Sequence, residues 1–522
     1  MKKNVKELGQ YFTPEIIANF MVKLSSVNKD RNVLEPSCGE GVFIKCLENN
    51  KYLNIDAFEV DSTLNNISNT NIIYESFISQ EISKKYSLII GNPPYIRWKN
   101  LEENLKNELS NNKLWNKYFN SLCDYLYIFI LKSIELLEDN GELIFITPEY
   151  WMHTTHSISL RNYMVEKGYF EKIIHFSETP IFDGVSSSII IFKFIKNPNI
   201  NPEIKFIEYK NTRKINEEAI NFIANEEQNE SIEYMNIPAF EKDKKWILAT
   251  KDIIEELKIY ESHCISINSY IKIKKDFVTM NDISDVGNGM VSGLDKSFQI
   301  NLDFNTLSEL EKKSTIKVLK AKSLNSYIHK EYINYIFLNE SLNEEDFKNL
   351  YPNFYNQLKN EQSKLDERYN YNKDIKYWEW VFLRNYNLFN SPKDKIFVPC
   401  KERISHKKFF RFSYAEQEFF PTQDVTAIYL KDNVKESIYY ILALLNNHRV
   451  FNWIKYNGII KGNIVEFSEK PINSIPIRLI NWNNRSEIEI HNKIELLTKE
   501  YIETNNSRLL KQINFELDKL FI

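Results

Sequence analysis

The sequence predicts an α/β protein followed by a second domain of mixed α+β structure. The chain has 522 residues, which is too long for a single ordinary core and indicates two or more domains. Strand-like and helix-like segments alternate through the first half, and this alternation weakens after about residue 196. We therefore expect a boundary near residue 245, with domains at 1–245 and 246–522.

The strands of the first domain are expected at short runs of buried-looking residues. These runs are "NVLEPS" (32–37), "NIDAFEV" (54–60), "YSLIIG" (86–91), "ELIFITP" (142–148), "EKIIHF" (171–176) and "SSSIIIFKFI" (186–195). Helices are expected at 41–50 and at 124–141, the second ending at Gly141. Strands that alternate with helices predict a mostly parallel sheet with helices on both faces.

The second domain has a less regular pattern. The segment "TKDIIEELKIYE" (250–261) predicts an amphipathic helix. Short strand-like pieces rich in tyrosine and phenylalanine follow, with few clear helices until the stretch 487–521. This mixture is typical of an α+β domain.

Composition excludes several classes of protein. The five cysteines are scattered and form no CxxC pair, so neither a disulfide framework nor a zinc site is expected. No run of eighteen apolar residues is present and the first residues contain no apolar signal segment, so we expect a cytoplasmic protein without a membrane span. The net charge of −4 neither requires nor excludes a nucleic-acid partner, because binding depends on local positive charge.

The glycine-containing turn "EPSCGEG" (35–41) lies between a predicted strand and a predicted helix. Glycines allow a tight turn and a close approach of the backbone to a ligand. The third glycine of a dinucleotide motif and the lysine of a phosphate loop are both missing. Glu59 ends the next strand, where an acid can accept hydrogen bonds from ribose hydroxyls. Together these features predict a cofactor that contains a nucleoside but no pyrophosphate.

A second motif follows the strand at 86–91. Asn92, Pro93, Pro94 and Tyr95 form a stiff turn that removes two N–H donors and presents the Asn92 amide oxygen and the Pro93 carbonyl. Two acceptors that face one place suit an amino group with two N–H bonds, and the Tyr95 ring offers a face on which a planar base can stack. A proline turn that merely caps the strand would explain this motif alone, but the glycine turn and Glu59 favour a site.

These segments resemble, in the same order, the motifs of the gamma-class (Taq-type) DNA adenine-N6 methyltransferases. The matching segments are "GQYFTPEIIANFM" (9–21), "VLEPSCGEGVFI" (33–44), "DAFEVD" (56–61), "SLIIGNPPY" (87–95), 124–151 and "IFDGVSSSIIIFKF" (181–194). Fainter likeness to the specificity domain of that family occurs at 281–300 and 439–477. The resemblance implies a Rossmann-like S-adenosylmethionine-dependent methyltransferase domain followed by a C-terminal target-recognition domain.

The resemblance also implies S-adenosyl-L-methionine as the cofactor. The residues that it assigns to cofactor binding are Tyr11, Thr13, Pro14, Glu35, Ser37, Gly39, Glu59, Val60, Ser76, Phe77 and Asn92. One position departs from the family pattern, because Ser76 stands where the family usually has an aspartate that binds the cofactor adenine. A hydroxyl can still accept that hydrogen bond, and Glu75 is the alternative.

The reaction implied is methyl transfer to the N6 amine of an adenine rotated out of the duplex. The residues assigned to catalysis are Asn92, Pro93, Pro94, Tyr95 and Phe182, the last as a second aromatic facing the base. Ordinary core packing is the alternative for Phe182. No metal is expected, because positioning and electrostatics supply the rate.

Double-stranded DNA is the expected partner. The segment "KERISHKKFFRF" (401–412) is predicted to hold phosphates through Lys401, Arg403, Lys407, Lys408 and Arg411. A solvated basic loop explains the same charges equally well. The sequence is compatible with a cognate restriction endonuclease on a separate chain, and it leaves monomer and dimer open.

Three other functions use a similar pocket. Enzymes that methylate protein glutamine share the Asn-Pro-Pro-Tyr turn, but the segment 10–14 and the long second half favour DNA. An RNA adenine methyltransferase is a second alternative. A non-catalytic DNA-specificity subunit is the third, and the intact Asn92–Tyr95 turn argues against it.

Overall fold

The computed structural model describes residues 11–182, 188–265, 270–271, 276–404, 408–461 and 463–521. The chain divides into two compact units. The first comprises Met1–Ile254 with Lys461–Asn463, and the second comprises Glu255–Ile460 and Ile464–Ile522.

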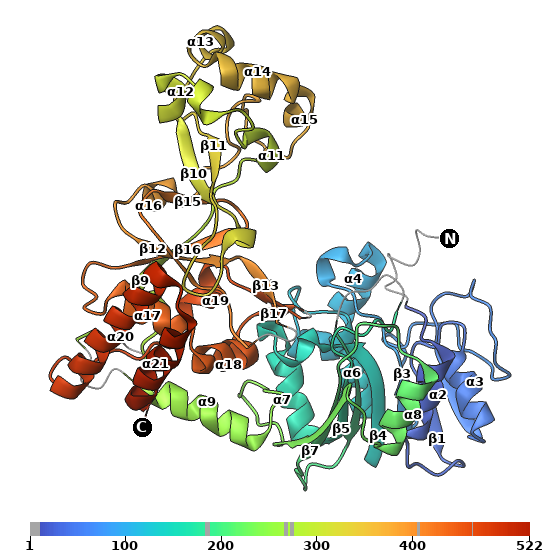
Figure 1. The fold of residues 1–522 in the computed structure, drawn as a ribbon. Coiled ribbons are helices and arrows are strands. Elements are labelled where there is room, and N and C mark those ends of the chain that lie inside the picture. Colours follow the sequence, from blue (N-terminus) through green and yellow to red (C-terminus); the bar gives the residue numbers. More distant parts are fainter. Residues whose placement is uncertain are drawn as a thin grey trace. The chain divides into compact units, whose positions relative to one another are not determined.

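The first unit is built on an eight-stranded sheet in the order β2-β1-β3-β4-β6-β5-β7-β8 (Figure 1). The strands are β1 (Asn32–Glu35), β2 (Asn54–Ala57), β3 (Tyr86–Gly91), β4 (Leu137–Pro148), β5 (Tyr169–His175), β6 (Ile189–Ile195), β7 (Ile204–Tyr209) and β8 (Ile232–Ile237). Strands β2, β1, β3 and β4 are mutually parallel, and β5 is parallel to β7. Strand β6 is antiparallel to both β4 and β5, and β8 is antiparallel to β7.

The sheet is therefore mixed, and the prediction of a mostly parallel sheet is wrong for its second half. All seven residues of β6 are buried. A strand buried on both faces has the same continuous apolar sequence in either direction, so the pattern alone does not show its orientation.

Helices cover both faces of this sheet, as predicted. The helices are α2 (Glu15–Lys23), α3 (Val42–Asn49), α4 (Glu103–Asn111), α5 (Lys113–Tyr118), α6 (Leu126–Leu136), α7 (Ile158–Lys167) and α8 (Glu217–Asn225). One core contains residues of α2, α3 and α8, and a second core contains residues of α4 to α7.

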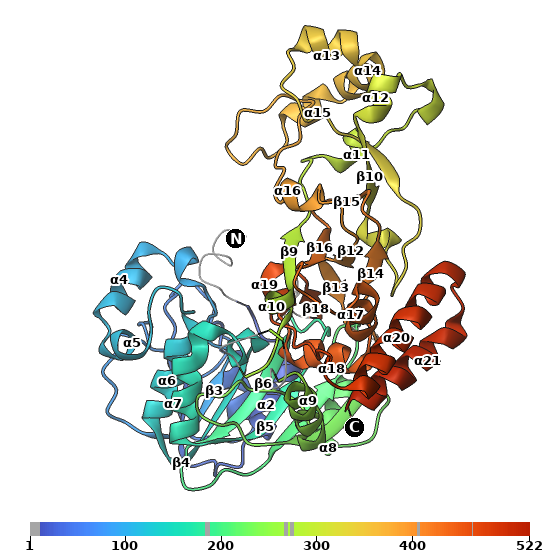
Figure 2. The same ribbon diagram turned by 90° about the vertical axis from the view of Figure 1, so that its left-hand side faces the viewer.

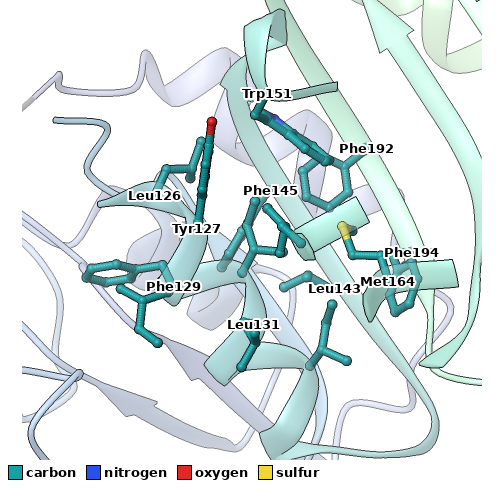
Figure 3. Close-up of a cluster of buried hydrophobic side chains, with 14 of the residues drawn as sticks. Leu126, Tyr127, Phe129, Leu131, Leu143, Phe145, Trp151, Met164, Phe192 and Phe194 are labelled. Atoms are coloured by element: carbon teal, nitrogen blue, oxygen red, sulfur yellow. The ribbon is translucent and has the colours of Figure 1, made fainter. Parts of the chain in front are cut away.

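Successive residues of the central strands alternate between these two cores. In β3, Leu88 and Ile90 pack with α2 and α3, whereas Ile89 packs with α6. Leu143 and Phe145 of β4 join the second core, and Figure 3 shows both among side chains of α6 and β6. Ten of the eleven residues of α6 are buried, which explains why this helix has no polar face.

The helix expected at 124–141 is shorter than predicted. Helix α6 ends at Leu136 and β4 begins at Leu137, which takes extended backbone angles and pairs with Tyr86. Gly141 lies inside β4, where a Cβ atom would be only 2.9 Å from the Glu138 carbonyl oxygen. Gly141 is thus required by a close backbone approach within the strand, and the uninterrupted apolar sequence hid the change from helix to strand.

The second unit is a mixed α+β structure, as predicted. Its strands are β9 (Ser284–Asn288), β10 (Thr315–Leu319), β11 (Ile333–Ile336), β12 (Lys395–Pro399), β13 (Lys401–Arg403), β14 (Ser413–Ala415), β15 (Phe419–Pro421), β16 (Val425–Leu430) and β18 (Ile464–Glu466). A four-stranded sheet has the order β14-β12-β16-β9, a three-stranded sheet has the order β11-β10-β15, and β13 pairs with β18.

Helices of the second unit are more numerous than the sequence suggested. They are α9 (Lys251–His263), which begins in the first unit, α10 (Met280–Ile283), α11 (Asp295–Phe298), α12 (Glu309–Lys313), α13 (Glu344–Leu350), α14 (Pro352–Asn360), α15 (Gln362–Asp366), α16 (Tyr386–Phe389), α17 (Ile438–Leu445), α18 (His448–Asn457), α19 (Glu469–Asn473), α20 (Arg485–Thr504) and α21 (Ser507–Asp518). Helices α9, α20 and α21 were expected, and the last two lie side by side (Figure 2). Most of the unexpected helices are nine residues or shorter, too short to show a clear helical period.

No helix among the described residues is both long enough and apolar enough to cross a membrane.

The second core of the first unit predicts a large effect of truncating Phe145, which is fully buried. Phe145→Ala removes apolar contacts and leaves a cavity, so we expect the free energy of unfolding to fall by about 3–5 kcal/mol. Leu53→Ala is the matched control, because Leu53 is 73% exposed, and we expect a change within about 0.5 kcal/mol. Denaturant unfolding of both variants tests this, and equal losses would contradict the core described here.

Candidate active site

A pocket opens in the first unit at the carboxyl ends of β1, β2 and β3, the edge at which open α/β sheets bind ligands. Its empty volume is about 720 Å³, including open solvent at the mouth. The lining residues are Tyr11, Phe12, Pro36, Ser37, Gly39, Glu59, Val60, Glu75, Ser76, Phe77, Asn92, Pro94, Ile96, Leu105, Tyr125 and Phe129.

The glycine turn forms one wall of this pocket. Gly39 has φ 56° and Gly41 has φ 87°, a left-handed region that favours glycine. A Cβ atom at Gly41 would also lie 3.1 Å from Oδ1 of Asn66. The turn leaves the Gly39 N–H directed at the carboxylate of Glu59, to which it donates a hydrogen bond of 2.8 Å.

Glu59 is held rigidly at the end of the pocket. Its Oε1 accepts hydrogen bonds from the backbone N–H groups of Val60 (2.9 Å) and Asp61 (3.0 Å), while Oε2 accepts the bond from Gly39. The side chain is only 7% exposed. A carboxylate has about four acceptor positions, so one remains for a ligand hydroxyl after these three bonds.

Glu35 supplies a buried carboxyl group at the end of β1. It is 1% exposed, and its Oε2 has no hydrogen-bond partner in the part of the chain that the structure describes. Burial raises the pKa of Glu35 well above its usual value, and repulsion from Glu59 adds to this shift. A buried carboxyl group of this kind is suited to a cationic ligand group, which would stabilise its ionised form.

The Asn92 side chain has one end fixed and one end bare. Its Nδ2 donates a hydrogen bond of 2.8 Å to the backbone carbonyl of Tyr11, and Ser37 Oγ donates one of 3.3 Å to the Asn92 carbonyl. The Asn92 Oδ1 atom is buried and has no partner among the described residues. Because a buried polar atom is normally hydrogen-bonded, this oxygen is marked as an acceptor for a ligand.

Three aromatic rings meet beside this amide. The rings of Tyr11 and Tyr95 stack with centroids 5.1 Å apart and planes 4° apart. The Phe182 ring packs against the Tyr11 ring, with centroids 6.0 Å apart and planes at 44° to each other. Burial is the main cause that raises the pKa of Tyr95 well above its usual value. The nearby Asn92 side chain opposes part of this shift, although the Tyr95 hydroxyl and the Asn92 Oδ1 atom form no hydrogen bond with each other.

Ser76 reaches the pocket together with a residue that the sequence did not reveal. Its Oγ donates a hydrogen bond to Oε1 of Glu108 on α4 and accepts one of 3.3 Å from the Ile78 N–H. Glu108 was missed because it belongs to a polar helix with no motif. Phe12, Leu105 and Phe129 also line the pocket, and the sequence analysis did not assign them to it.

Six predicted residues are not among those that line the pocket: Thr13, Pro14, Glu35, Pro93, Tyr95 and Phe182. Thr13 and Pro93 are buried, and the Pro14 carbonyl accepts the first hydrogen bond of α2 from the Ile17 N–H at 2.9 Å. Val60, Phe77 and Pro94 do line the pocket, as do Ser37 and Gly39.

The predicted DNA-binding residues, which lie in the second unit, differ from one another in their surroundings. Lys401 and Arg403 of β13 are exposed, as is Lys408, whereas Lys407 lies outside the described residues. Arg411 is different, because its guanidinium group is directed inward. Its Nε donates to Oε1 of Glu402 at 2.6 Å and its Nη1 donates to the carbonyls of Ala321 and Leu324. This geometry does not support Arg411 as a phosphate contact.

The sheet, the glycine turn and the Asn-Pro-Pro-Tyr turn define a Rossmann-like methyltransferase fold. The model of the Eco57I restriction-modification methylase family matches residues 19–182. The type II methyltransferase M.HindII of Haemophilus influenzae is 45% identical over 520 residues, which cover 99% of this chain and 98% of that protein. The type II methyltransferase M.HincII of Haemophilus influenzae is 44% identical and covers the same shares. The chain therefore belongs to the type II methyltransferases of restriction-modification systems.

A solved structure shares the fold over nearly the whole chain. The type IIL restriction-modification enzyme MmeI, in complex with DNA, aligns with a TM-score of 0.59 at 12% identity and covers 97% of this chain and 72% of its own.

The inward direction of Arg411 predicts a structural role for this residue. The Glu402 side chain is 1% exposed and that of Arg411 is 25% exposed. Arg411→Ala removes the guanidinium group that pairs with the buried Glu402 carboxylate, so we expect the free energy of unfolding to fall by about 2–4 kcal/mol, somewhat less than for a fully buried pair. Lys408→Ala is the exposed control and is expected to change stability by less than about 0.5 kcal/mol. Thermal unfolding distinguishes the two, and a stable Arg411→Ala variant would return this residue to the DNA-contact candidates.

Proposed function

We propose that this chain transfers a methyl group from S-adenosyl-L-methionine to the N6 amine of an adenine rotated out of double-stranded DNA. The observation that carries the proposal is the bare Oδ1 of Asn92, held beside the Tyr95 ring by a hydrogen bond at the other end of its amide. Membership of the type II methyltransferases supports methyl transfer within a restriction-modification system.

The pocket fits the proposed cofactor at three of its groups. Glu59 keeps an acceptor position for the ribose hydroxyls after its three backbone bonds. Glu35 offers a buried oxygen without a partner among the described residues, which suits the positively charged amine of the methionine part. Val60 and Phe77 supply apolar walls for a purine ring.

Ser76 and Glu108 together suit the amine of the cofactor adenine. The Ser76 hydroxyl donates to Glu108, so its own oxygen is more electron-rich and accepts a hydrogen bond more strongly. The Glu108 carboxylate, acting through the Ser76 hydroxyl, thus supplies the negative charge that an aspartate at position 76 would provide directly. Glu108 is therefore proposed to compensate for the missing aspartate at position 76.

The target amine is a weak nucleophile, because its lone pair is delocalised into the purine ring. Asn92 Oδ1 and the Pro93 carbonyl accept its two N–H bonds, which directs the amine towards tetrahedral geometry and frees the lone pair. These two acceptors are fixed before the reaction, so little reorganisation is needed as charge develops. S-adenosylmethionine, when bound, supplies a sulfonium methyl group that is already activated for transfer.

Tyr95 and Phe182 hold the extruded base in this proposal. Rotating a base out of the duplex costs a few kcal/mol. Stacking on an aromatic ring returns about 1–3 kcal/mol of this cost. Phe182 is buried and Tyr95 is half-buried, so the two rings limit the access of water to the amine, which strengthens the hydrogen bonds to Asn92 and Pro93.

The second unit is proposed to select the DNA sequence. Its exposed cations Lys401, Arg403 and Lys408, together with Lys407, are proposed to contact phosphates. Methylation of the selected site protects the host DNA from a cognate endonuclease, which is proposed to reside on a separate chain. Residues 246–522 would then act as the target-recognition domain.

The proposed reaction predicts the behaviour of Asn92→Ala. This change removes one acceptor that matters most as charge develops on the amine, so the rate of methyl transfer should fall about 100- to 1,000-fold. DNA from cells that express the wild-type chain should carry N6-methyladenine at one sequence, and DNA from cells with Asn92→Ala should not. Methylation-sensitive sequencing gives the site, and single-turnover transfer to a duplex that contains it gives the rate.

Two results would contradict the proposed reaction. The first is a methyl group found on cytosine, RNA or protein but not on adenine of DNA. The second is an Asn92→Ala variant with a nearly normal rate. Asn120→Ala, in a loop that does not line the pocket, is the matched control and is expected to retain the wild-type rate.

The cofactor pocket predicts a loss of affinity in Glu59→Ala. Each charge-assisted hydrogen bond contributes about 1.5–3 kcal/mol, so S-adenosylmethionine should bind at least about tenfold more weakly. Glu40→Ala removes an exposed carboxylate from the same glycine turn and should leave the affinity unchanged. Isothermal calorimetry on both variants, with Glu59→Gln as a milder change, tests the ribose contact. Equal affinities for Glu59→Ala and the wild type would remove Glu59 from the site.

A further inference from the structure

We infer that the Tyr11 side chain fills the slot of the target base in the free enzyme and leaves it when the base enters. This inference rests on the proposed function, because it concerns the same aromatic slot. Tyr11 would then be a positioning residue with two separable parts: a backbone carbonyl that orients Asn92 and a ring that takes the place of the base.

The positions of the three rings support this role. Tyr11 stacks on Tyr95 with a centroid distance of 5.1 Å and an angle of 4°, and it also contacts Phe182 at 6.0 Å. A base inserted between two parallel rings needs them about 7 Å apart, because each stacked contact takes about 3.5 Å. An adenine therefore has no room on this face of Tyr95 until the Tyr11 ring moves.

The Tyr11 ring can leave without disturbing the Asn92 amide. The hydrogen bond from Asn92 Nδ2 ends on the backbone carbonyl of Tyr11, at 2.8 Å, and does not involve the ring. Rotation about χ1 moves a side chain between staggered positions while the carbonyl stays in place. The acceptor Oδ1 of Asn92 consequently keeps its direction when the slot changes occupant.

The exchange replaces one stacked ring by another. When the Tyr11 ring occupies the slot, it shields the faces of Tyr95 and Phe182 from water, and the two rings keep their positions before DNA binds. The filled state also competes with the base, because apparent affinity falls by the fraction of molecules whose slot is open. From the strength of an aromatic pair, we expect the Tyr11 ring to lower the apparent affinity for the base about two- to tenfold.

Extrusion of the target base measures this competition directly. The probe is a duplex that contains the mapped methylation site. Permanganate oxidation of the thymine opposite the target adenine is measured, because this oxidation increases when the adenine leaves the base stack. The full-length chain is used at saturating S-adenosylhomocysteine, so that weaker cofactor binding does not obscure the result. The equilibrium constant for extrusion is compared between the wild type, Tyr11→Ala, Tyr11→Leu, Tyr11→Phe and Tyr95→Ala.

Tyr11→Ala and Tyr11→Leu are expected to raise the extrusion constant about two- to tenfold, because neither side chain stacks on Tyr95. Tyr11→Phe keeps the ring and should extrude the base to the wild-type extent. Tyr95→Ala should lower extrusion, because the base loses its stacking surface. A residue that merely supports the fold would not raise extrusion when it is truncated.

The outcomes separate this inference from the proposed function. A wild-type chain that leaves the thymine as unreactive as in free duplex would overturn base extrusion and the role of Tyr11 with it. A reactive wild-type complex with unchanged or lower extrusion in both Tyr11→Ala and Tyr11→Leu would overturn the role of Tyr11 alone.

Discussion

The site depends on a single hydrogen bond, from the Asn92 amide nitrogen to the carbonyl of Tyr11. An asparagine side chain can point either its oxygen or its nitrogen at a ligand, and only the oxygen can accept an N–H bond. By engaging the nitrogen, the Tyr11 carbonyl leaves Oδ1 as the only end of the amide that a substrate meets. In the proposed reaction the segment before the first strand is thus as necessary as the turn that carries Asn92.

The sheet supplies the frame in which this bond can form. Strands β1 and β3 are parallel neighbours, so their carboxyl ends bring the glycine turn and the Asn-Pro-Pro-Tyr turn to one edge. Gly91 lies between the two, where a Cβ atom would be 3.4 Å from Cγ of Glu35. In the proposed function Glu35 belongs to the cofactor side and Asn92 to the substrate side, so this close approach would bring the two bound molecules together, as transfer between them requires.

Sequence reasoning was most effective where chemistry and chain order coincide. The glycine turn, Glu59 and the Asn92–Tyr95 turn each follow a strand directly. The alternation of strand-like and helix-like segments therefore predicted that they lie at one edge of the sheet. Glu108 was missed because its contact with Ser76 depends on how α4 packs, and local sequence does not contain that information. Arg411 illustrates a second limit of the sequence: a basic segment does not show that one of its cations is hydrogen-bonded to the buried Glu402. The prediction for Lys401, Arg403, Lys407 and Lys408 remains a prediction.

The buried carboxyl group of Glu35 couples ligand binding to proton uptake and release. Its pKa lies well above the usual value in the free protein, because burial and the charge of Glu59 disfavour ionisation. A cation placed against the carboxyl group favours the ionised form and lowers that pKa again. At a pH below the raised pKa, binding of a cationic ligand against Glu35 would release a proton, and the affinity would rise with pH until the carboxyl group of the free protein is itself ionised. The same carboxyl group is thus a reporter: the heat of binding depends on the ionisation enthalpy of the buffer that receives the proton.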